Sequence, residues 1–138
     1  MEPPAICHPV LTAKPVSPLP SSPAVGADGL IFVSGRTSTV AGAATVRGSF
    51  KEEFHRSREN ARLVLEAANR DLPHAVQTRD NLQNSADLPL SNKLHRSCFP
   101  PPFPARTTLL NCLAEVPLFE VKVFAVPKAA GSPGASTS

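Results

Sequence analysis

Arg106 and Glu120 are the two residues of this sequence whose types and surroundings best suit chemistry on a small molecule. Arg106 follows Pro104 and Ala105 and comes just before an apolar stretch that predicts a strand, so its guanidinium would project from a sheet edge. The planar guanidinium binds a carboxylate through two parallel charge-assisted hydrogen bonds, which lysine cannot reproduce. A surface arginine paired with a glutamate is the competing interpretation, and spacing alone favours it.

Glu120 lies in an alternating stretch in which it points away from Phe119 and Val121, toward either solvent or a cleft. A carboxylate beside a cleft can act as a general base for water. Ser34 and Gly35 follow a buried apolar stretch and offer a hydroxyl and an unhindered backbone N–H to a small polar ligand. A Ser-Gly pair is equally an ordinary strand end, and the residues alone favour that interpretation.

These residues need a scaffold, and the hydrophobic pattern predicts one. The clearest helix lies between Ser49, an N-cap with Glu52 in the capping-box position, and Asn69. The other predicted elements are a hairpin of 24–25 and 30–33 that ends at Ser34–Gly35, a weak strand at 75–82, a second helix at 87–97, and strands at 107–113 and 119–126. This order indicates an α+β fold with both helices on one face of a mixed sheet. The second face then needs cover, which other copies of the chain would provide.

Length and composition exclude several classes of protein. The 138 residues suit one domain at 18–127, preceded by a proline-rich arm at 1–17 and followed by a disordered tail at 128–138. No apolar run reaches the roughly 18 residues of a membrane span, so a soluble, cytoplasmic protein is expected. The three cysteines and four histidines lack metal-ligand spacing, and neither tryptophan nor tyrosine is present to stack on RNA bases. We therefore expect no metal site and no nucleic-acid partner.

Five segments together resemble the Rid family of reactive-intermediate deaminases, also called the YjgF/YER057c/UK114 family. They read LPSSPAV, GLIFVSGR, GSFKEEFHRSRENARLVLEAA, PPFPARTTLLNCL and FEVKVFAV. The resemblance implies a chorismate-mutase-like α+β fold and a homotrimer with clefts between subunits. It also implies hydrolysis of enamines and imines such as 2-aminoacrylate to 2-keto acids and ammonia, without a cofactor.

The resemblance also implies roles for individual residues. Arg106 would hold the substrate carboxylate, and Glu120 would position or deprotonate the attacking water. The remaining site residues would be Ser34 and Gly35 on the cleft floor, Asn92 in the cleft, Thr108 where many members carry cysteine, and Ser21 where an aromatic residue is usual.

Two further positions depart from the family pattern. Arg36 replaces a usual glutamine, which adds positive charge near the cleft mouth. Asp80 stands where a valine is usual, and a buried, unpaired carboxylate is costly. We therefore expect either a partner for Asp80 or a distorted strand.

Two other functions stay open from the sequence. A divergent or non-catalytic trimer that binds small carboxylates is suggested by Ser21 and by the altered strand at 79–81. An RNA-acting member of the family is permitted by the pI near 9.0, and its binding should weaken steeply with salt.

Overall fold

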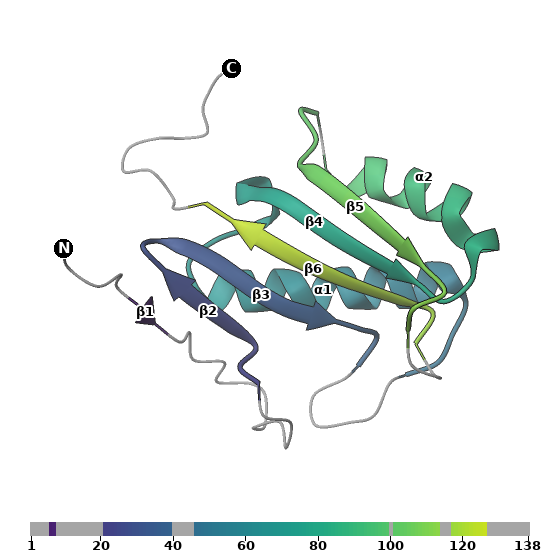
Figure 1. The fold of residues 1–138 in the computed structure, drawn as a ribbon, viewed down its shortest axis with the longest axis horizontal. Helices are drawn as coiled ribbons and strands as arrows, with labels where there is room; N and C mark the ends of the chain where they lie inside the picture. Colours follow the sequence, from purple (N-terminus) through teal and green to yellow (C-terminus); the bar gives the residue numbers. More distant parts are fainter. Residues whose placement is uncertain (1–5, 8–20, 40–45, 100, 114–116, 127–138) are drawn as a thin grey trace.

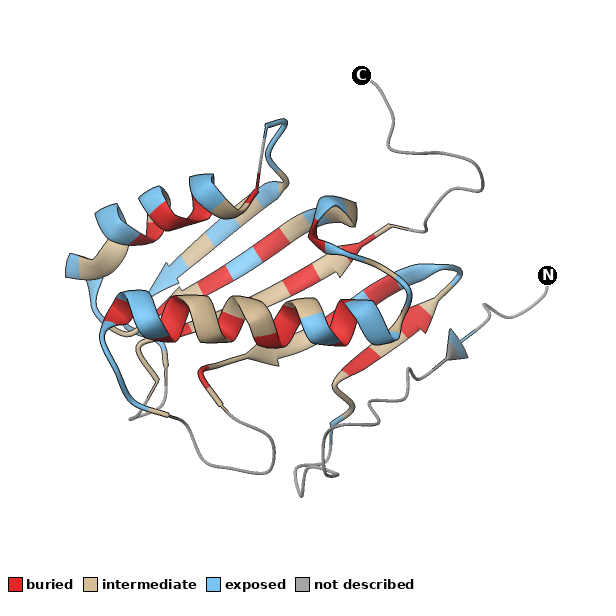
Figure 2. Ribbon diagram, turned by 180° about the vertical axis from the view of Figure 1, so that it is seen from behind, coloured by how far each residue is buried: buried red, intermediate tan, exposed pale blue. Residues whose placement is uncertain are grey.

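The computed structural model describes residues 6–7, 21–39, 46–99, 101–113 and 117–126. These residues form an α+β fold in which two helices cover one face of a mixed sheet (Figures 1 and 2), as the sequence predicts. The strands run in the order β1-β2-β3-β6-β4-β5. The bounds are β1 Ile6–Cys7, β2 Ala24–Ala27, β3 Leu30–Arg36, β4 Ala75–Leu82, β5 Ala105–Leu110, β6 Phe119–Ala125, α1 Phe50–Ala67 and α2 Leu88–Cys98.

Helix α1 begins as the sequence predicts, at a capping box. The Glu52 backbone N–H donates to Ser49 Oγ at 3.2 Å, and the Ser49 N–H donates to Glu52 Oε1 at 2.9 Å. These bonds satisfy two backbone donors that the first helical turn leaves without partners. The apolar side of the helix, which includes Phe54, Val64 and Leu65, is buried against the sheet.

Strand β4 forms although its sequence is poor in strand-forming residues, and it has one register shift, between Ala75 and Gln77. It pairs with β6 on one side, antiparallel, and with β5 on the other, parallel. Ladder hydrogen bonds on both sides outweigh the weak propensity of the central residues. Thr78, Asp80 and Leu82 are buried, so these alternate residues point to the helix-covered face, and the residues between them point to the opposite face.

Strands β3 and β5 differ most from the predicted bounds. Strand β3 continues through Ser34 and Gly35 to Arg36, and its pairing with β6 shifts register between Val33 and Arg36. Strand β5 begins at Ala105 and stops at Leu110, because Asn111 has a positive φ of 56° and donates its N–H to the Leu82 carbonyl at 2.8 Å. Cys112, which falls within the strand predicted at 107–113, lies beyond the end of β5 and is exposed.

The expected arm and tail fall almost wholly outside the described residues. The exception is the short strand β1, whose two residues pair antiparallel with β2. No helix in the described ranges is long and apolar enough to cross a membrane.

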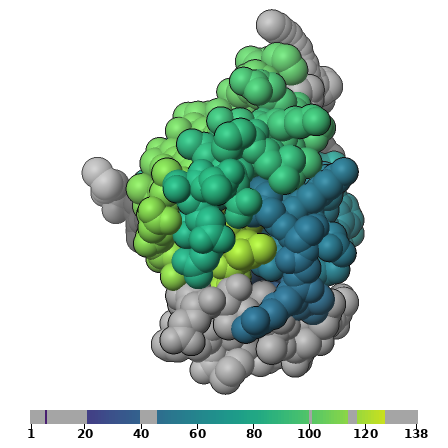
Figure 3. Space-filling model, turned by 90° about the vertical axis from the view of Figure 1, so that its right-hand side faces the viewer, coloured from purple at the N-terminus to yellow at the C-terminus, as the bar shows by residue number. Residues whose placement is uncertain are grey.

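The face of the sheet opposite the helices, here called the open face, carries exposed apolar side chains. Phe32 is 41% exposed and Leu109 is 53% exposed. Phe32 meets Phe124 edge-on with ring centroids 5.4 Å apart, and the Arg79 guanidinium lies 5.5 Å from the Phe124 ring centre. The helices adjoin one another on the other side of the sheet (Figure 3). The open face thus lacks cover from the described part of this chain, as the sequence predicts.

Candidate active site

Arg106 lies at the edge of the sheet, beneath α2, with partners on all three guanidinium nitrogens. Its Nε donates to Asp80 Oδ2 at 2.6 Å, Nη1 to Asn92 Oδ1 at 2.5 Å and Nη2 to Ser91 Oγ at 3.3 Å. A guanidinium has five N–H groups, so these three bonds leave two for another ligand. The side chain is 20% exposed. Arg106 is therefore held in place by β4 and α2 while part of it still reaches solvent.

Asp80 has a partner, which is one of the two outcomes expected for a buried carboxylate at this position. Its side chain is 1% exposed, and it pairs with Arg106 in the part of β4, from Gln77 to Leu82, where the register is continuous. Burial raises the pKa of this carboxyl, and the neighbouring Arg106 charge opposes that rise. Asp80 Oδ1 has no hydrogen-bond partner among the described residues. The pair is thus a buried ion pair with one carboxylate oxygen still unsatisfied.

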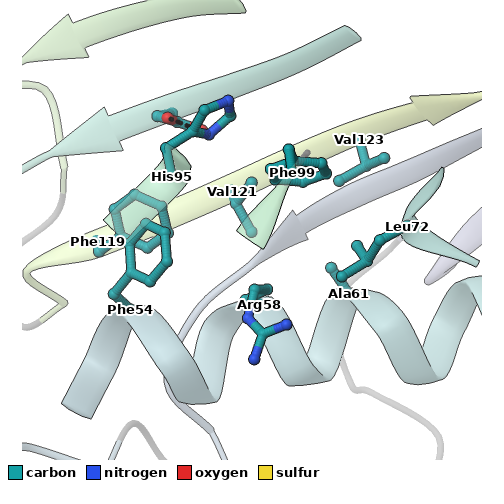
Figure 4. A pocket seen from close by; sticks show the side chains of 10 residues that line it. Phe54, Arg58, Ala61, Leu72, His95, Phe99, Phe119, Val121 and Val123 are labelled. Carbon is teal, nitrogen blue, oxygen red and sulfur yellow. Dashed lines mark ion pairs between the residues drawn. The ribbon is translucent and has the colours of Figure 1, made fainter. Parts of the chain in front are cut away.

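His95, on α2, lies beside Asp80 and is the last member of this group. Its Nδ1 lies 4.0 Å from Asp80 Oδ2, and its ring packs on Phe99 with centroids 4.7 Å apart. Burial, followed by the nearby Arg106 charge, lowers the pKa of His95 to about 4. The imidazole is therefore neutral near pH 7 and does not form a second ion pair with Asp80. It borders a small cavity of about 10 Å³ (Figure 4), room for about one water molecule.

This buried neutral histidine gives a testable pH dependence. An exposed histidine has a pKa near 6.5, so the unfolded chain takes up a proton at higher pH than folded His95 does. The stabilisation is therefore present above pH 6.5 and is lost as the pH falls toward 4. We expect the free energy of unfolding to drop by up to about 2 kcal/mol more in wild type than in His95→Gln between pH 7 and pH 5. Urea denaturation at both pH values measures this difference, and parallel pH profiles for the two proteins would contradict it.

A hollow opens beside the exposed part of Arg106. It has a volume of about 280 Å³ and is lined by Asn92, His95, Arg96, Phe103, Pro104 and Arg106. This volume is at the small end of the range for ligand sites, which suits a molecule of a few heavy atoms. The apolar surfaces of Phe103 and Pro104 lie beside the Arg106 guanidinium in this hollow. This combination suits a short organic anion.

Glu120 lies on the other face of the sheet, in a second group. Asn81 Nδ2 donates to Glu120 Oε1 at 2.7 Å, which holds the carboxylate over the open face. Gly35 leaves room for it, because a Cβ at that position would lie 2.6 Å from the Glu120 carboxyl carbon. Arg36 is close by, and its Nε donates to the Ser34 and Gly35 carbonyls at 3.1 Å each. Burial lowers the pKa of Arg36, and the Glu120 charge partly offsets that effect.

The predicted site residues therefore separate into two groups within one chain. Asn92 joins Arg106 under α2, and Thr108, paired with Asp80 across the β4–β5 ladder, is half-buried on the same side. Gly35 joins Glu120 on the open face. The Ser34 hydroxyl donates to the Ser22 carbonyl at 2.6 Å, and Ser21 is exposed just before β2.

The sequence does not predict several members of these two groups as site residues, namely Asp80, Asn81, Ser91 and His95. It marks Asp80 only as a departure from the family pattern. Asp80 and Asn81 share one signal, which is that polar residues interrupt a stretch where a strand is required.

Neither group resembles a metal centre, since no three His, Cys, Asp or Glu side chains of the described ranges are placed to hold one ion.

The chain is similar to known proteins in sequence and in fold. The family model described as Endoribonuclease L-PSP matches residues 12–127. The chain is 29% identical over 118 residues to a 2-iminobutanoate/2-iminopropanoate deaminase of Dermatophagoides farinae, covering 85% of this chain and 89% of the relative. It is 33% identical over 90 residues to the mitochondrial protein mmf2 of Schizosaccharomyces pombe, covering 65% of this chain and 71% of that protein. The crystal structure of yeast Mmf1 has the same fold, with a TM-score of 0.81 at 22% identity over 90% of this chain and all of that one.

Proposed function

Because the chain belongs to the endoribonuclease L-PSP family, also called the Rid family, we propose that it hydrolyses reactive enamines and imines to 2-keto acids and ammonia. The substrates would be small 2-imino acids and their 2-aminoacrylate-type enamines. The observation that carries this proposal is Arg106, which keeps two free N–H groups beside a hollow of about 280 Å³. The relative named as an imine deaminase supports the same reaction.

In the proposed reaction, Arg106 binds the substrate carboxylate and so fixes the position of the neighbouring imine carbon. Glu120 accepts a proton from water as the water oxygen bonds to that carbon, and the electron pair of the C=N bond moves to nitrogen, which is protonated. The nitrogen of the resulting carbinolamine then takes the proton held by Glu120, and the hydroxyl proton is lost to solvent. The C=O bond forms as the C–N bond breaks, which releases ammonia. An enamine first takes a proton on its terminal carbon to become the imine. Asn92, Thr108, Ser34 and the Gly35 N–H would orient the substrate, and Ser21 would leave one side of the site open.

We further propose that two copies of the chain build each site, in a homotrimer. Arg106 and Glu120 point to opposite faces of one sheet, so a small substrate cannot reach both within one chain. A second copy placed against the open face would bring its own Arg106 edge to Glu120 of the first. The exposure of Phe32 and Leu109 on that face supports such an assembly, since apolar surface of this kind favours association.

The activity is tested by keto-acid and ammonia release from an imino acid that an amino-acid oxidase generates in the assay. Wild type should accelerate release over the spontaneous rate, and Arg106→Ala should not. Asp80→Asn/Arg106→Gln is a second variant, which removes both buried charges together and so avoids leaving one unpaired. Arg62→Ala, on the exposed side of α1, serves as the arginine control. Equal rates for wild type and both Arg106 variants would remove the assignment.

A second candidate is a trimer that binds small carboxylates without turning them over. The buried Asp80 at Arg106 and the exposed Ser21 in place of an aromatic residue favour it, because both depart from the family pattern that implies turnover. Binding of 2-oxobutanoate together with imine hydrolysis at the spontaneous rate would select this candidate over the deaminase.

Gly35→Ala gives a further prediction about Glu120. The added Cβ would lie 2.6 Å from the carboxyl carbon, so the end of the glutamate side chain must move away from Asn81. We expect imine hydrolysis to fall about tenfold, while the free energy of unfolding changes by less than about 1 kcal/mol. Gly48→Ala is the control, because the atoms nearest to its Cβ belong to the exposed Glu52 side chain, at 3.2 Å, far from Glu120 in the sequence. Unchanged hydrolysis in Gly35→Ala would contradict the placement of Glu120 at the reacting water.

A further inference from the structure

We infer that Asp80 sets how strongly this site prefers a carboxylate, by neutralising the Arg106 guanidinium from the buried side. The inference rests on the proposed function, since it takes the Arg106 hollow as the place where the substrate anion binds. It makes Asp80 a positioning and specificity-determining residue that has no contact with the substrate.

The arrangement of the two charges carries this inference. Asp80 Oδ2 lies 2.6 Å from Arg106 Nε, and the aspartate side chain is 1% exposed where the arginine side chain is 20% exposed. The negative charge is therefore behind the guanidinium, and only the cation reaches the hollow. Water and salt cannot screen a charge so deeply buried, so a carboxylate at Arg106 is attracted by the guanidinium and repelled by Asp80.

The other charged groups around the pair do not replace the lost attraction. His95, from α2, is neutral near pH 7 because its pKa is about 4. Arg58, from α1, lines the small cavity that Asp80 also lines, and it does not line the hollow. Arg96, also on α2, lines the hollow but is exposed, where solvent screening keeps its contribution small. The pair therefore presents far less net charge to a ligand than an unpaired arginine would.

The same contact orients the guanidinium. Asp80 takes the Nε N–H, which turns Nη1 and Nη2 toward Asn92, Ser91 and the hollow. An asparagine at position 80 keeps an oxygen that accepts from Nε but removes the negative charge. Asp80→Asn thus separates the electrostatic role of the residue from its role in orientation.

The experiment compares the binding of 2-oxobutanoate with that of its uncharged amide, 2-oxobutanamide, by isothermal titration calorimetry at pH 7. We expect Asp80→Asn to bind 2-oxobutanoate about tenfold more tightly than wild type, since one nearby repulsive charge is gone. Its affinity for the amide should stay within about twofold. Glu66→Gln, an exposed carboxylate on α1, should change neither affinity. Unchanged or weaker binding of 2-oxobutanoate to Asp80→Asn would overturn the inference.

Steady-state kinetics provide a readout that a purely structural role would not move. Asp80→Asn should lower KM for a 2-imino acid about tenfold and leave kcat within about twofold. A fall in kcat without a fall in KM would show that Asp80 only supports the fold, and would overturn the inference.

Wild type alone provides a second test should Asp80→Asn fail to fold. We expect wild type to bind 2-oxobutanoate and 2-oxobutanamide with affinities within about threefold of each other, because the paired arginine offers little net charge. A preference for the carboxylate of about 30-fold or more would overturn the inference, as would failure to bind either ligand. Binding that follows this pattern without turnover would refute the deaminase proposal alone, and turnover with a strong carboxylate preference would refute only the role of Asp80.

Discussion

Replacing Glu120 with glutamine is expected to lower the rate of imine hydrolysis by about 100- to 10 000-fold, the usual contribution of a general base. Glutamine has nearly the same shape and keeps an oxygen that can accept the Asn81 hydrogen bond, now 2.7 Å long. It cannot take a proton from water. The fold should therefore be retained while the proposed chemical step is lost. The rate of that step is measured as keto-acid release from an enzymatically generated imino acid.

Two controls separate this loss from a general defect. Glu120→Gln should still bind 2-oxobutanoate, since the carboxylate of that ligand contacts Arg106 in the proposed site. Glu66→Gln, on the exposed side of α1, should retain the full rate. A Glu120→Gln variant that hydrolyses imines at the wild-type rate would show that this carboxylate is not the base.

The second large effect concerns stability. Arg106→Ala should lower the free energy of unfolding by about 3 kcal/mol or more, because it leaves the Asp80 carboxylate buried without its partner. Arg62→Ala removes the cation that pairs with Glu59 and Glu66, but on an exposed helix surface, and should cost less than about 1 kcal/mol. Urea denaturation of the three proteins at pH 7 measures the difference.

A double variant checks the cause of that loss. Asp80→Asn/Arg106→Gln leaves no unpaired charge and should recover most of the stability that Arg106→Ala loses, since an uncharged hydrogen-bonded pair avoids the desolvation of an isolated ion. The explanation fails if Arg106→Ala is as stable as Arg62→Ala, or if the double variant is as unstable as Arg106→Ala.

Local features of this fold could be predicted from the sequence because their signals lie within a few residues. The capping box of Ser49 and Glu52 spans one turn of helix, and the apolar spacing that follows it predicts the buried side of α1. The alternation around Glu120 likewise predicts that its side chain points away from Phe119 and Val121. The α+β class follows from the order of such elements.

The division of the site could not be predicted, because it depends on how strands pair. Asp80 meets Arg106 through the parallel β4–β5 ladder, and the two residues are 26 positions apart in the sequence. Asn81 meets Glu120 through the antiparallel β4–β6 ladder, at a separation of 39. A shift of one residue in either register would turn the side chains of the shifted strand to the opposite face of the sheet. The sequence therefore marks Asp80 as a departure from the family pattern but does not identify its partner.

Subunit mixing tests most directly the central claim that Arg106 of one copy and Glu120 of another act on the same imine. Asp80→Asn/Arg106→Gln and Glu120→Gln are each expected to be inactive alone. When the two variants are unfolded together in equal amounts and refolded, random assembly should leave about one site in four with both residues intact. The account predicts that imine hydrolysis returns to about a quarter of the wild-type rate. A refolded mixture that stays as inactive as its two parents would contradict it.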